Sequence, residues 1–217
     1  MKNIPMFTGQ HGMATLVFRE LSYSGCAYVL VRAVWNGETA AFLEECRSFC
    51  RAVGAEKIYA SWEENALPAN HAYDVLGLCR EKSGLSLPRR EVELEELRPA
   101  NGADYLQIYN TCFRPVSGAA SYDKQDLQRL YGQDCAFLAK IDGEYAAVAE
   151  ISKEGLESIA VMPQYSGLGY DLSLTVLPMV PSLTLRLKVA STNRRALELY
   201  QRLGFEQENI RSRWYEL

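Results

Sequence analysis

The stretch from Ser158 to Leu172 constrains this 217-residue chain more than any other. A short apolar run reaches Pro163, a loop follows with two glycines one residue apart, Gly167 and Gly169, and an apolar pattern then indicates a helix. The stretch therefore predicts a strand, a tight turn and a helix. Glycines let the backbone approach a ligand closely, and the first amides of a helix lack intrahelical partners, so such a turn can bind phosphate groups. Gly-x-Gly also occurs in turns that bind nothing.

A second strand and helix follow this turn. Residues 183–189 alternate apolar and polar, which is typical of a half-buried strand, and residues 193–203 indicate a helix that Gly204 ends. With both stretches in view, the chain resembles the GNAT superfamily of acyl-CoA-dependent N-acyltransferases. The matching patterns are V-x-P-x-x-S-G-x-G, from Val161 to Gly169, and N-x-x-A-x-x-x-Y-x-x-L-G-F, from Asn193 to Phe205.

Two residues depart from the family pattern. The family usually has arginine or glutamine where this chain has Ser166, and a small residue where it has Asp171. A register that starts at Gln164 recovers the sequence pattern but changes the spacing from Pro163, so we prefer the first register. An aspartate beside a diphosphate would lower affinity through like-charge repulsion, although at a helix start it also interacts favourably with the dipole.

The resemblance implies a role for each part of the two motifs. Loop amides would hold the pyrophosphate of acetyl-CoA, and the strand before the loop would diverge from its neighbour and pair with the pantetheine arm. The Val161 amide would stabilise the oxyanion, and Asn193 would cap its helix. The residues expected to bind the co-substrate are Ala160, Val161, Ser166, Gly167, Leu168, Gly169, Tyr170, Asp171, Asn193 and Ala196.

Two catalytic residues are expected by the same resemblance. Tyr200 would protonate the leaving thiolate. Glu157 lies four residues before Val161, hence on the same face of the strand, and would act as the base. Each has a plainer interpretation, because Tyr200 could be a core aromatic of an amphipathic helix and Glu157 a solvated strand residue.

The remaining pattern predicts an α/β (α+β) fold with a mixed, mostly antiparallel GNAT-type sheet flanked by helices. Residues 98–217 would form a GNAT-like domain, with its early elements expected as helices at 103–113 and 123–131, a hairpin at 135–152 and a strand at 156–162. Residues 1–97 would form an N-terminal α/β domain, with strands at 14–21, 27–35, 57–62 and 90–97 and helices at 39–53 and 69–81.

The first half has the same element order as the second, so we expect two GNAT-like units in tandem, the first a partial and degenerate copy. A generic α/β domain would show the same pattern. In the first half the stretch from Trp35 to Thr39 has no glycine pair and carries Glu38 where phosphates would lie.

Composition excludes several functions. The net charge of −4 gives no basic surface for nucleic acid. No apolar stretch is long enough to cross a bilayer and no secretory signal is visible, so we expect a cytoplasmic protein with no membrane partner. The six cysteines are scattered and only two histidines occur, which favours reduced thiols and no metal site.

We therefore expect an N-acetyltransferase that transfers an acetyl group from acetyl-CoA to a primary amine of a small molecule or peptide by direct attack. One alternative is a non-catalytic module that keeps the fold to bind acyl-CoA or a protein, and another is a purely structural pairing domain. The acceptor itself is not readable, because in this fold residues 103–131 would build its pocket and loops carry no recognisable code.

Overall fold

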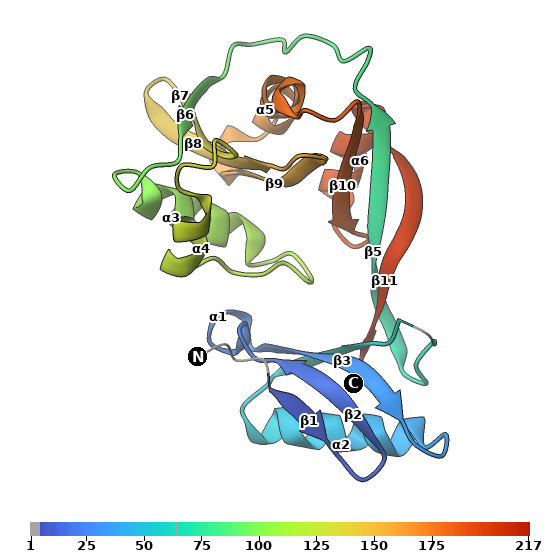
Figure 1. Cartoon of the computed structure of the whole chain (residues 1–217). Helices are drawn as coiled ribbons and strands as arrows, with labels where there is room; N and C mark the ends of the chain where they lie inside the picture. Colours follow the sequence, from blue (N-terminus) through green and yellow to red (C-terminus); the bar gives the residue numbers. More distant parts are fainter. Residues whose placement is uncertain (1–4, 64) are drawn as a thin grey trace. The chain divides into compact units, whose positions relative to one another are not determined.

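The computed structural model describes residues 5–63 and 65–217, and the chain divides into two compact units (Figure 1). Unit 1 comprises the chain up to Val75 together with Ala190–Thr192 and Ile210–Leu217. Unit 2 comprises Leu76–Val189 and Asn193–Asn209. This division differs from the expected boundary at 97/98, because the chain passes from unit 1 to unit 2 within a strand, between Val75 and Leu76.

Unit 1 is a sheet covered by one long helix. Its strands lie in the order β1 (Met6–Thr8), β2 (Gly12–Val17), β3 (Cys26–Val34), β4 (Lys57–Ser61) and the last part of β11 (Glu206–Glu216). The helix α2 (Thr39–Ala52) is amphipathic and buries Phe42, Leu43, Cys46 and Cys50 against the sheet, as its apolar spacing predicts. A single helical turn, α1 (Leu21–Ser24), takes the place of the turn expected between β2 and β3.

Unit 2 is a sheet with helices on both faces. The strands lie in the order first part of β11, second part of β5 (Asn70–Glu81), β10 (Thr184–Ala190), β9 (Gly155–Val161), β8 (Glu144–Ile151), β7 (Ala136–Ile141) and β6 (Glu93–Glu96). Pairing is antiparallel from β6 to β9 and parallel between β9 and β10. The helices are α3 (Gly102–Phe113), α4 (Lys124–Leu130), α5 (Leu168–Val176) and α6 (Arg194–Arg202), with two short 3-10 turns at Pro163–Tyr165 and Leu177–Met179.

Two cores follow from this layering. Apolar side chains of α5 and α6 pack with one face of the sheet, around Leu168, Leu172 and Leu185. Those of α3 and α4 pack with the opposite face, around Tyr105, Leu127 and Leu138. The expected elements of residues 103–205 are confirmed, with shifts of one or two residues at their ends.

The helix expected at 69–81 is wrong, since these residues form β5. Its sequence contains good helix formers, but strand pairing overrides propensity here. Lys82 N donates to Leu183 O at 2.7 Å, while Ser191 N donates to Asp74 O at 2.8 Å, so the middle of β5 and the residue after its end bond to the residues that flank β10. The first half therefore lacks one of the two helices that gave it the same expected element order as the second half.

The two units exchange strands along the chain. The final residues of β11 belong to unit 1, where Tyr215 pairs with Ala60 of β4. In unit 2 the neighbour of β10 is β5, which comes from the first half of the sequence. Each unit is therefore completed by a strand that is distant in sequence.

Two further expectations concern the whole chain. All six cysteines are free thiols, as expected. Among the described residues, no helix combines the length and the apolar character needed to cross a bilayer.

Candidate functional site

A cleft opens in unit 2 where two parallel strands part. β9 and β10 pair at Arg186↔Gly155 and Leu187↔Leu156, and in the described chain this register extends no further. Beyond that point, Ile159, Ala160 and Val161 line a cleft of about 400 Å³. The other lining residues come from α3 and its following loop, the glycine turn and α6: Cys112, Phe113, Pro115, Val116, Gly167, Gly169, Tyr170, Asn193, Arg195, Ala196, Glu198, Leu199 and Arg202.

Both glycines of the turn have a structural reason to be glycine. Gly167 is the N-cap residue of α5 and has φ +98°, in the left-handed region that side chains disfavour. At Gly169, a Cβ atom would lie 3.3 Å from Leu199 Cδ2 and 3.7 Å from Val161 Cγ2. The turn therefore leaves the backbone amides at the start of α5 uncovered by side chains, beside the open edge of β9. Such exposed amides suit a phosphate-containing ligand.

The N-terminus of α6 forms the opposite wall. The Asn193 side chain accepts a hydrogen bond from Ala196 N at 3.2 Å and caps the helix, as expected, and both residues line the cleft. Arg195 reaches back to the turn, where its Nη2 donates to Ser166 Oγ at 2.9 Å. The helix therefore links the two sequence motifs directly.

Tyr200 lies deeper than the cleft wall. Its residue surface is 6% exposed, it packs edge-on against Phe205 with ring centroids 6.0 Å apart, and it belongs to the core around Leu172. Burial raises the pKa of its phenol, which keeps it protonated at neutral pH. The residues that line the cleft include its helix neighbours Ala196 and Leu199 but not Tyr200 itself.

Asp171 is buried and satisfied by hydrogen bonds. Its residue surface is 4% exposed; Oδ1 accepts from Arg89 N at 2.8 Å and Oδ2 accepts from Arg90 Nε at 3.1 Å. Leu168, one turn earlier, is also buried, with its side chain in the core. The carboxylate that the sequence places next to a phosphate site is thus paired with an arginine instead of standing alone.

Comparison with known families identifies the domain that contains this cleft. Residues 103–205 match the model of the acetyltransferase (GNAT) family. Residues 103–205 form a GNAT domain. The match covers both motifs, α3 and α4, and the parted strands, so the expected family is confirmed.

Solved structures support the same fold across both units. A functionally unknown conserved protein from Staphylococcus epidermidis is similar over 100% of this chain and 94% of its own, with 16% identity and a TM-score of 0.60. A GCN5-related N-acetyltransferase from Sphaerobacter thermophilus is similar over 94% of this chain and 75% of its own, with 14% identity and a TM-score of 0.57. No curated protein matches the sequence.

A third structure bears on the two-unit architecture. It is a tandem GNAT protein from the clavulanic acid biosynthesis pathway, similar over 95% of this chain and 78% of its own, with 13% identity and a TM-score of 0.53. At such identities the likeness concerns the fold alone. The expected fold class, a mixed sheet flanked by helices with two GNAT-like units in tandem, is confirmed.

A bulge in β9 of the GNAT domain lies at Glu157. Glu150 of β8 pairs with Ser158 and Ile151 pairs with Leu156, so a bulge leaves Glu157 without an opposing residue. A bulge breaks the alternation on which the shared face with Val161 depends. Glu157 is exposed and lies outside the residues that line the cleft.

A half-buried carboxylate to which the sequence motifs did not point lies beside this bulge. Glu150 accepts a hydrogen bond from Tyr122 Oη at 2.8 Å, on the sheet face covered by α3 and α4. Burial raises the pKa of its carboxyl group, and the negative charge of Glu157 adds to the rise. The signal was a single acid in the apolar strand Y-A-A-V-A-E-I, from Tyr145 to Ile151.

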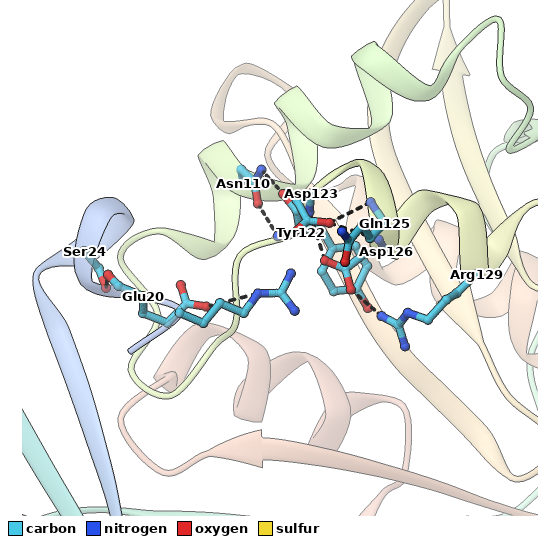
Figure 2. Close-up of polar contacts among 9 residues, drawn as sticks. Glu20, Ser24, Asn110, Tyr122, Asp123, Gln125, Asp126 and Arg129 are labelled. Atoms are coloured by element: carbon cyan, nitrogen blue, oxygen red, sulfur yellow. Dashed lines mark hydrogen bonds and ion pairs between the residues drawn. The ribbon is translucent and has the colours of Figure 1, made fainter. Parts of the chain in front are cut away.

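The loop before α4 holds Tyr122 in place (Figure 2). Asn110 brackets the residue, because its Oδ1 accepts from Tyr122 N at 2.8 Å and its Nδ2 donates to Tyr122 O at 2.9 Å. Asp123 then caps α4 in a capping box with Asp126, which also pairs with Arg129. These hydrogen bonds hold the backbone of Tyr122, and its side chain packs in the core beneath α3.

Aromatic rings connect Tyr122 to the cleft. Its ring stacks on Tyr109 with centroids 3.9 Å apart, and Tyr109 contacts Phe113 at 4.5 Å. Phe113 lines the cleft. Near Glu150, the hydroxyls of Tyr105 and Ser158 are buried close to each other.

Glu150→Gln is expected to remove part of the pH dependence of stability. Because the folded state raises the pKa of this carboxyl group, it holds the proton more tightly than the unfolded chain, so stability falls as pH rises above the unfolded value. Glutamine keeps an acceptor for Tyr122 and carries no charge. We expect the variant to melt about 2–4 °C above the wild type at pH 8, a shift that corresponds to about 1 kcal/mol in a domain of this size.

Thermal melts from pH 4 to pH 8 measure this effect. The difference between variant and wild type should disappear as the pH approaches 4, where both side chains are neutral. Glu144→Gln is the matched control at an exposed position of the same strand. A variant that melts below the wild type at pH 8 would show that the Glu150 charge stabilises the fold.

Proposed function

We propose that unit 2 transfers an acetyl group from acetyl-CoA to a primary amine of a small molecule or peptide, by direct attack in a ternary complex. The observation that carries this proposal is the parting of β9 from β10 directly in front of the glycine turn. The unpaired strand edge from Ile159 to Val161 offers backbone groups to an extended amide-containing ligand, and the turn offers bare amides to phosphates. Acetyl-CoA has both parts.

In this proposal the thioester supplies an activated acetyl group, and the chain supplies binding and proton transfer. The amide of Val161 is suited to stabilise the negative charge that develops on the carbonyl oxygen. The amine nitrogen forms a bond to the carbonyl carbon as the carbon–sulfur bond breaks, and the amine loses a proton to solvent or to a base. Tyr200 is the proposed donor of a proton to the departing thiolate, because its phenol is protonated at neutral pH; burial raises the pKa of this phenol and makes it a weaker acid in the free protein.

The acceptor is proposed to bind on the side of the cleft formed by Cys112, Phe113 and Val116. Apolar and aromatic groups dominate this side, which suits the carbon skeleton of an amine more than a strongly anionic substrate. We also propose that the protein works in the cytoplasm, where free thiols such as its six cysteines persist.

Calorimetric titration with acetyl-CoA and with free CoA, followed by an amine screen, tests the function. We expect saturable binding of both ligands and release of free thiol when a matching amine is present. Tyr200→Phe preserves the packing against Phe205, so we expect unchanged affinity for CoA but a turnover lowered about 100-fold, the lower range for loss of an acid catalyst.

Other outcomes of this experiment favour other functions. Tight CoA binding with no transfer to any amine would favour an acyl-CoA-binding module, an alternative that the deep position of Tyr200 supports. Unchanged turnover in Tyr200→Phe would assign that residue to packing alone. No binding at millimolar ligand would exclude the acetyltransferase.

A further inference from the structure

We propose that Arg90 and Arg195 supply the positive charge for the diphosphate of CoA that the glycine turn lacks at Ser166, and that Asp171 is a positioning residue that holds Arg90 at the turn. This inference rests on the proposed function, since it concerns how the same cleft binds its acyl donor. It assigns a role in phosphate binding to three side chains, in addition to the backbone amides of the glycine turn.

Asp171 fixes the segment that precedes β6 to the first turn of α5. Its two carboxylate oxygens accept from the backbone amide of Arg89 at 2.8 Å and from Nε of Arg90 at 3.1 Å. With Nε engaged, the guanidinium of Arg90 is oriented, and its Nη2 lies 3.9 Å from the position that a Cβ atom would occupy on Gly167. A cation therefore stands beside the left-handed glycine that opens the helix.

Arg195 approaches the same turn from α6. Its Nη2 donates to Ser166 Oγ at 2.9 Å, and the residue lines the cleft. A guanidinium carries five N–H donors in a planar fork, so this single bond leaves donors free to contact phosphate oxygens. The hydroxyl of Ser166 thus places an arginine from another helix at the position where the motif would otherwise carry its own.

Two more arginines contact the ring of Tyr170, beside the glycine turn. The guanidinium carbons of Arg89 and Arg202 lie 5.3 Å and 5.0 Å from the centre of its ring, and Arg202 also lines the cleft. Such cation–π contacts fix arginines at an exposed surface. On a chain with net charge −4, four arginines converging on one glycine turn form a local positive site that fits a polyanion.

This arrangement reverses the expected effect of Asp171 on affinity. If the carboxylate acted only by repelling the diphosphate, Asp171→Asn would strengthen binding. If it positions Arg90, the same change releases the guanidinium and weakens binding. The sign of the change distinguishes the two.

Calorimetric titration of the full chain with CoA tests the inference. Arg90→Ala, Arg195→Ala and Asp171→Asn should each weaken CoA binding about five- to tenfold, the effect of losing one partly exposed charge-assisted contact. Arg194→Ala removes an exposed arginine next in sequence to Arg195 but outside the cleft lining, and should leave affinity unchanged. Adding Ser166→Arg to the Arg195→Ala variant should restore affinity.

Dephospho-CoA separates the diphosphate from the 3′-phosphate. We expect the same losses with dephospho-CoA as with CoA, and losses seen with CoA alone would overturn the diphosphate assignment. Thermal melting identifies any variant that fails to fold. If Asp171→Asn is such a variant, the CoA affinity of Arg90→Ala tests the inference in its place. Wild-type binding with unchanged variants would overturn this inference alone, whereas no wild-type binding would overturn the proposed function as well.

Discussion

Gly169→Glu is expected to abolish binding of acetyl-CoA and CoA. The first atom of any side chain at this position lies 3.3 Å from Leu199 and 3.7 Å from Val161, so the longer side chain must enter the cleft between α6 and β9. Its carboxylate would also face the phosphates across a short distance in partly desolvated surroundings, where like-charge repulsion is strong. We expect an affinity at least about 100-fold lower, which corresponds to about 2.8 kcal/mol.

Titration calorimetry on three variants separates the causes. Gly169→Gln has nearly the same size without the charge and should show the steric part of the loss. Gly169→Ala adds only the Cβ atom, which Leu199 can accommodate by a small shift, so its affinity should fall less than tenfold. CoA binding by Gly169→Glu with wild-type affinity would show that the ligand does not pass this glycine. The proposed function would then lack a phosphate-binding site.

Gly155→Ala is expected to cause the largest loss of stability of any single methyl addition in unit 2. A Cβ atom at Gly155 would lie 1.7 Å from Arg186 O and 2.6 Å from Arg186 C, which are backbone atoms of the neighbouring strand. The contact falls at one of the two residue pairs that join β9 to β10, so relief of the clash separates these strands. We expect a loss of about 3 kcal/mol or more in the free energy of unfolding, at the upper end for overpacking.

Urea unfolding of Gly155→Ala against Gly143→Ala measures this cost. Gly143 lies in the β7–β8 turn with φ +84°, and an added Cβ atom there meets nothing within 4 Å, so the control reports backbone strain alone, about 1 kcal/mol. CoA affinity should also fall in Gly155→Ala, because the cleft begins where this pairing ends. Equal unfolding midpoints for the two variants would show that the strands move apart at little cost.

The sequence predicted the GNAT domain well because its signals are local. The turn at Gly167 needs a left-handed residue, Asn193 needs only its own helix to cap, and the order of strands and helices from 103 to 205 follows from periodicity. The helix expected at 69–81 failed for the opposite reason, since β5 exists only through pairing with strands more than 100 residues away.

Side-chain roles were harder to predict than elements. The bulge at Glu157 leaves no mark in the sequence, so strict alternation is not enough to assign the face on which this side chain lies. Asp171 looked like a defect in the phosphate site, because its partners, Arg89 and Arg90, lie 82 and 81 residues away and follow no motif. For Asp171, a contact distant in sequence decides what the residue does.

The exchange of strands also determines when the protein can fold during synthesis. Unit 1 closes its sheet with residues 210–217, so its core cannot be completed until these residues have been synthesised, although most of it is made first. Unit 2, in contrast, takes up β5 from a segment that has already left the ribosome. Long-range pairing of this kind slows folding and prolongs the exposure of unpaired edges, so we expect the nascent first half to be a substrate for chaperones.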